Sequence, residues 1–187
     1  MPRLSSVPYL PAQCTGGPFG RGLPIGLVLH RTEGNYAHIL QTMTQGPNPK
    51  QKSVHFMVGK RDGEVIQMVD TNMVAYHVGP GANQIYLGIE FESIKAQDGI
   101  HGQDPLTNQD PLTEWQFAKG REIVDWICRT HGIRKVGPPS AREWTKCGGR
   151  WHGVLGHADV AKGGYFHTDH GDQLMDRDYI LLNVWLV

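Results

Sequence analysis

The sequence has few cysteines, no excess of charge of either sign and no long apolar run, and each shortage excludes a class of protein. Its three cysteines, Cys14, Cys128 and Cys147, match neither a zinc-knuckle nor a CxxC spacing, and their odd number excludes a complete disulfide framework. Cys128 falls in an expected helix as a small core residue, which leaves only a Cys14–Cys147 bridge open. Lys+Arg and Asp+Glu are balanced at 18 each, so nothing favours nucleic acid or an anionic membrane as a partner.

The sequence also lacks the segments that would place it in or across a membrane. No apolar stretch is long enough to span a bilayer, and residues 1–8 lack the apolar core of a secretory signal. We therefore expect a soluble chain that is made in the cytoplasm. It would act there, or at the cell wall or periplasm after signal-independent export or lysis.

What the sequence does have is histidine and enough apolar residues for a core. The 187 residues are 39% apolar and 19% charged, which suits one globular domain. Ten histidines are the unusual feature, because histidine is the commonest metal ligand. Residues 1–23 are rich in proline and predict an irregular arm laid over the surface, with the domain itself at residues 24–187.

The hydrophobic pattern predicts strands with interleaved helices. The apolar run Leu27-Val28-Leu29 predicts a buried strand that ends on His30. The remaining expected elements are strands at 53–59 and 64–69 joined by an Asp-Gly turn, strands at 85–92 and 154–155, and helices at 35–46, 113–132 and within 172–187. This mixture predicts an α/β fold with a mixed central sheet flanked by helices.

Histidines and an aspartate follow two of these strands and suggest a metal site. His30 ends the first strand, and His157 follows the last one. Together with Asp169 they form a set of two imidazoles and one carboxylate that suits zinc and leaves a fourth position for water. His167 and His170 compete with Asp169 as the third ligand, and the alternative is that all are hydrogen-bonded polar residues at strand ends.

A hydrolytic site also needs a base, and two glutamates are candidates. Glu90 and Glu92 alternate with apolar residues, so the expected strand points both carboxylates to one face. A carboxylate within an apolar strand is costly to bury unless it faces a cleft or a partner. Either one of them serves as a base, or both belong to a half-solvated strand face.

Six sequence blocks, in this order, carry a family resemblance. They are Leu27-Val28-Leu29-His30, Ser53-Val54-His55-Phe56, Arg61-Asp62-Gly63, Ala75-Tyr76-His77-Val78-Gly79, Leu87-Gly88-Ile89-Glu90 and Gly156-His157-Ala158-Asp159-Val160-Ala161. Over residues 24–175 the chain resembles the zinc-dependent N-acetylmuramoyl-L-alanine amidases. That family includes phage lysozyme-type amidases, bacterial muropeptide-recycling amidases and animal peptidoglycan recognition proteins.

The resemblance implies a reaction and roles for particular residues. His30, His157 and Asp169 would hold one zinc ion, and Glu90 would act as general base. The bond cleaved would be the amide between N-acetylmuramic acid and L-alanine of the stem peptide, in peptidoglycan or in muropeptides. The bacterial pattern has a lysine where this chain has His167, which would then stabilise the oxyanion, more strongly when protonated, so that activity would fall as pH rises.

The resemblance also suggests residues that bind the substrate. His77 would line the groove at the sugar–peptide junction, unless it is a structural histidine packed beside Tyr76. Arg31 and Asn83 are further candidates for binding the stem peptide.

Other functions stay open at this stage. The main alternative is a module that recognises peptidoglycan without cutting it, although such members typically lack a metal ligand. A metal-dependent phosphoesterase is disfavoured because no basic or Gly-rich phosphate cradle is present. As an amidase, the protein could recycle muropeptides, serve as a phage endolysin, or act as an antibacterial effector, which would imply an immunity protein as partner.

Overall fold

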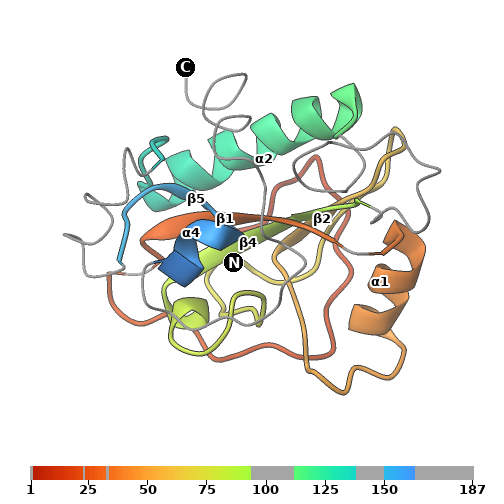
Figure 1. The fold of residues 1–187 in the computed structure, drawn as a ribbon, viewed down its shortest axis with the longest axis horizontal. Helices are drawn as coiled ribbons and strands as arrows, with labels where there is room; N and C mark the ends of the chain where they lie inside the picture. Colours follow the sequence, from red (N-terminus) through yellow and green to blue (C-terminus); the bar gives the residue numbers. More distant parts are fainter. Residues whose placement is uncertain (1, 23, 33, 94–111, 138–149, 163–187) are drawn as a thin grey trace.

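A five-stranded sheet forms the centre of the protein (Figure 1). The computed structural model describes residues 2–22, 24–32, 34–93, 112–137 and 150–162. Within them the strand order is β3-β2-β4-β1-β5. The strands are β1 (Gly26–Arg31), β2 (Phe56–Val58), β3 (Val65–Gln67), β4 (Tyr86–Phe91) and β5 (Val154–Gly156).

The sheet is mixed, as the sequence predicted. β1 pairs in parallel with both β4 and β5, and β2 pairs in parallel with β4. Among the strands of the described residues, only β3 runs antiparallel, because it forms a hairpin with β2. Gly63 in that hairpin has a φ of +86°, which accounts for the Asp-Gly signal. β1 continues one residue beyond His30, so His30 is not the last residue of the strand as expected but the one before it.

The helices begin and end where their capping residues predicted. In α1 (Tyr36–Thr44), the side chain of Asn35 accepts a hydrogen bond from the backbone N–H of His38. α2 (Glu114–His131) opens with a capping box between Thr113 and Gln116 and ends at Gly132, whose φ is +66°. The short elements are the 3-10 turn η1 (Ala82–Gln84) and α4 (His157–Lys162). The helix expected within 172–187 lies outside the described residues.

The two faces of the sheet differ in what they carry. On one face, which we call the helix face, Leu27, Leu29, Ile89 and other apolar strand residues pack against the buried side of α2. On the other face, which we call the cavity face, the alternating residues are Val28 and His30 of β1 and Gly88 and Glu90 of β4. Figure 1 shows α2 along one side of the sheet and α1 on the other.

The N-terminal arm contributes more than the surface cover that its prolines predicted. Leu4 and Val7 are buried in the same core as α2 and the helix face. Further along, the N–H groups of Leu10 and Ala12 donate to the carbonyls of Gln67 and Met68, so the arm adds to the open edge of β3.

Two further expectations can be compared with the described residues. Cys14 and Cys128 are free cysteines, and Cys147 lies outside the described residues. None of the helices in the described ranges combines the length and the hydropathy that crossing a membrane demands.

Candidate active site

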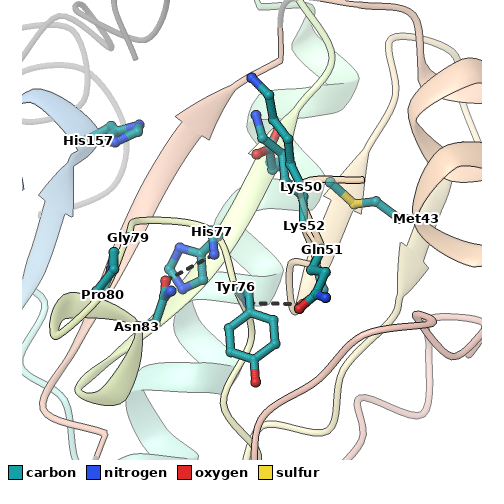
Figure 2. Close-up of a pocket in the computed structure, with 12 residues that line it drawn as sticks. Met43, Lys50, Gln51, Lys52, Tyr76, His77, Gly79, Pro80, Asn83 and His157 are labelled. Atoms are coloured by element: carbon teal, nitrogen blue, oxygen red, sulfur yellow. Dashed lines mark hydrogen bonds between the residues drawn. The ribbon is translucent and has the colours of Figure 1, made fainter. Parts of the chain in front are cut away.

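A cavity of about 350 Å³ opens on the cavity face, and four of the expected site residues line it: His77, Asn83, Glu90 and His157. Its other walls come from the end of α1, the loop before β2 and the loop before η1 (Figure 2). The full lining is Met43, Lys50, Gln51, Lys52, Ser53, Tyr76, His77, Gly79, Pro80, Asn83, Glu90 and His157. The cavity therefore brings together residues from segments that are far apart in the sequence.

His30 and His157 lie against each other beside this cavity. Both side chains are buried, with exposed fractions of 0% and 4%. His30 belongs to β1, and His157 is the first residue of α4, directly after β5, which pairs with β1. Their Nδ1 atoms are 3.1 Å apart. The sheet pairing therefore brings together two imidazoles that are 127 positions apart in the sequence.

The spacing of these two nitrogens suits a shared metal ion. Two nitrogen ligands of a tetrahedral zinc ion, each about 2.0–2.1 Å from the metal, lie about 3.3–3.4 Å from each other. The observed 3.1 Å is close to that value. Within the described ranges no group of three or more His, Cys, Asp or Glu could hold a metal. The expected third ligand, Asp169, and its competitors His167 and His170 lie outside them.

The structure separates the two candidate glutamates. Glu90 is paired in register with His30 on the neighbouring parallel strand, so both side chains project from the cavity face. Glu92 lies beyond the end of β4, and its carboxylate accepts hydrogen bonds from the backbone N–H groups of Tyr36 and Lys60. Glu92 is buried rather than half-solvated and joins the start of α1 to the turn between β2 and β3, whereas Glu90 lines the cavity.

His77 contacts His30 from the other side. Its Nδ1 is 2.9 Å from Nε2 of His30, and its own Nε2 is 3.2 Å from the carbonyl oxygen of Tyr86. The rings of His30 and His77 meet edge to face. Burial, with the neighbouring His30 and His55, holds the pKa of His77 well below its ordinary value, so this ring is neutral near pH 7.

The other two candidates for substrate binding have different positions. Asn83 lines the cavity, but its Oδ1 accepts hydrogen bonds from the backbone N–H groups of His77 and Val78, so it braces that loop (Figure 2). Arg31 alternates with His30 along β1, is buried, and is absent from the cavity lining. Its role in substrate binding stays a prediction.

Sequence reasoning gave no role to His55 or Gly88. Nδ1 of His55 accepts a hydrogen bond from the N–H of Gly88, and Nε2 donates to the carbonyl of Met73. Burial lowers the pKa of His55 to about 4. A glycine within a strand often marks a close approach, and this was the available signal for Gly88, where an added Cβ would lie 2.6 Å from Nδ1 of His77.

The fold and this site together define a mixed-sheet domain in which two adjoining histidines and a glutamate lie at one cavity. A family model described as N-acetylmuramoyl-L-alanine amidase matches residues 21–172. The chain therefore belongs to the N-acetylmuramoyl-L-alanine amidase family. No curated protein matches it.

Solved structures share the fold at low sequence identity. A hydrolase of Staphylococcus aureus, AmiA, aligns at 18% identity and a TM-score of 0.57, over 90% of this chain and 74% of that one. An AmpD derivative aligns at 21% identity and a TM-score of 0.57, over 92% and 91% of the two chains. The amidase LysC of Clostridium intestinale aligns at 17% identity and a TM-score of 0.53, over 96% of each chain.

Proposed function

We propose that this protein is a zinc-dependent peptidoglycan hydrolase that cleaves the amide between N-acetylmuramic acid and L-alanine of the stem peptide. One observation carries the proposal. In a chain of this family, two buried imidazole Nδ1 atoms lie 3.1 Å apart next to a glutamate that faces the same cavity. His30 and His157 would hold the metal, with Asp169 as the third ligand.

In the proposed reaction, the metal ligands, Glu90 and His167 would each have a separate role. A bound zinc ion supplies a Lewis acid that polarises a carbonyl and lowers the pKa of a water molecule. Glu90 would take a proton from the attacking water and deliver it to the nitrogen of the leaving L-alanine. Its pairing in register with His30 on the neighbouring strand supports this role, because proton transfer needs a base held in a fixed position. His167 would donate a hydrogen bond to the oxyanion.

The cavity wall opposite His157 suits the acidic stem peptide. Lys50 and Lys52 both line it (Figure 2). The side chain of Asn48 fixes their loop, because it accepts a hydrogen bond from the backbone N–H of Lys52 and donates one to the carbonyl of Lys52. Two cations there would attract the stem-peptide carboxylates. A structure of the Escherichia coli amidase AmiD, 20% identical with a TM-score of 0.51, contains the substrate anhydro-N-acetylmuramic acid-L-Ala-D-γ-Glu-L-Lys. We propose a muropeptide of this type as the ligand of this cavity.

The alternative is recognition of peptidoglycan without cleavage. Glu90 favours cleavage, because a module that only binds needs no carboxylate aligned with the metal ligands. Recycling, endolysin and effector roles all use the same reaction, and an effector would add an immunity protein as partner.

Zinc analysis combined with muropeptide digestion tests the proposal. We expect about one zinc per chain by elemental analysis, lost in His30→Ala and in Asp169→Ala, and products split between the muramyl sugar and L-alanine by mass spectrometry. The exposed His38→Ala serves as the control and should keep both zinc and activity. Intact muropeptides with no zinc would overturn the enzyme and leave a recognition module. Zinc retained in Asp169→Ala would make His167 or His170 the third ligand.

A further inference from the structure

His77 faces the cavity, yet both of its ring nitrogens are committed to the protein. Nδ1 contacts Nε2 of His30 at 2.9 Å, and Nε2 contacts the carbonyl oxygen of Tyr86 at 3.2 Å. Neither nitrogen is directed at a substrate. The family resemblance predicts that His77 contacts the sugar–peptide junction. That prediction does not explain why His77 contacts His30.

The hydrogen bonds assign the protons along this row of rings. A carbonyl oxygen only accepts, so Nε2 of His77 carries the proton toward Tyr86. A neutral ring has a single N–H, so Nδ1 of His77 holds a lone pair and accepts from Nε2–H of His30. A neutral His30 then keeps its own lone pair on Nδ1, the atom 3.1 Å from Nδ1 of His157. Neutral imidazole is also the form that binds a metal.

His77 is held in this position from two further directions. The side chain of Asn83 accepts hydrogen bonds from the backbone N–H groups of His77 and Val78 at 3.0 and 2.8 Å. Against β4, the ring fills the space that a side chain at Gly88 would occupy, where a Cβ would lie 2.6–2.8 Å from three ring atoms. The loop and the strand thus present one fixed nitrogen to His30.

We propose that His77 is a positioning residue that holds His30 in the tautomer whose Nδ1 lone pair points to the metal, through the row Tyr86 carbonyl–His77–His30. A metal-binding histidine is generally oriented in this way by an acceptor on its other nitrogen, and removing such an acceptor typically costs 10–100-fold in metal affinity. The inference rests on the metal site of the proposed function and does not depend on which bond is cleaved.

A matched pair of variants tests this role through zinc affinity. His77→Asn keeps an acceptor oxygen at the place of Nδ1, and His77→Leu has nearly the same size and shape without any acceptor. Zinc affinity is measured by competition with a chromogenic chelator. We expect His77→Leu to bind zinc 10–100-fold more weakly than the wild type, and His77→Asn to recover most of that loss. Equal zinc affinity in His77→Leu and the wild type would overturn the inference.

A second measurement needs no variant and so does not depend on the folding of either one. Long-range ¹H–¹⁵N correlation spectra of the metal-free wild type report the tautomer of each histidine. We expect His30 and His77 to carry their protons on Nε2, and a His30 protonated on Nδ1 alone would overturn the inference. Failure of the proposed reaction is distinguishable, because intact muropeptides beside normal zinc binding would contradict the amidase while leaving the role of His77 standing.

Discussion

The two faces of the central sheet are built from the same strands but carry different kinds of side chain. The helix face is mainly apolar, and Leu27, Leu29 and Ile89 pack there against α2. One position along each strand, the cavity face carries His30 and Glu90, paired in register. The comparison shows how one strand can carry polar site residues and remain stable. Burial of one set of side chains against a helix stabilises the backbone that holds the other set in place.

The largest effect that would test this separation is expected at Glu90. Glu90→Gln keeps the size of the side chain and removes the proposed base, so the rate of muropeptide hydrolysis should fall about 10²–10⁴-fold. Zinc content and the midpoint of thermal unfolding should not change.

Glu92→Gln is the matched control two residues away. It weakens the acceptor for the N–H groups of Tyr36 and Lys60, so it should lower the free energy of unfolding by about 1–3 kcal/mol. Activity per folded molecule should remain. Wild-type hydrolysis rates in Glu90→Gln would remove this residue from the mechanism.

The same pair of glutamates shows how far the sequence alone could go. Alternation in β4 and the caps at Asn35, Thr113 and Gly132 are local signals, and the structure confirms them. Alternation also placed Glu92 with Glu90, because periodicity does not tell where a strand ends. The partners of Glu92 come from Tyr36 and Lys60, which only the folded chain brings near it.

The role of His77 was out of reach for a similar reason. Its place beside His30 depends on the loop before η1 folding onto Gly88 of β4, an arrangement that no motif spacing encodes. The pairing of His30 with His157, in contrast, could be anticipated, since both follow apolar runs that become neighbouring parallel strands. The sequence could therefore predict which histidines meet at the ends of neighbouring strands, but not which loop residues contact them.

On the helix face, a comparable substitution should change stability and leave chemistry alone. Ile123 of α2 is fully buried in that core, so Ile123→Ala should lower the free energy of unfolding by about 2–5 kcal/mol in urea titrations. Zinc affinity and the hydrolysis rate of the folded protein should stay at wild-type values. Val136→Ala, at a side chain 40% exposed, is the control and should shift stability by less than about 0.5 kcal/mol. Weaker zinc binding in folded Ile123→Ala would show that the two faces are coupled.

The remaining effect concerns stability in acid, which a buried histidine of the cavity face should lower. His55 is fully buried with a pKa of about 4, below its ordinary value of 6.5, so below pH 6.5 the unfolded chain binds this proton more readily than the folded one. The free energy of unfolding should therefore decrease as pH falls from about 6.5 to about 4, by about 3 kcal/mol from this residue.

Urea titrations at pH 7 and pH 4 on the wild type and His55→Gln isolate this residue from the other titrating groups. Glutamine can accept from Gly88 and donate to Met73 as His55 does, but it does not titrate. The wild type should lose about 3 kcal/mol more than His55→Gln over this range, while the exposed His38→Gln should follow the wild type. Parallel losses in wild type and His55→Gln would mean that His55 accepts a proton in the folded protein as easily as in the unfolded one. Burial of this histidine on the cavity face would then not lower the free energy of unfolding in acid. The two faces would differ only in the chemistry of their side chains.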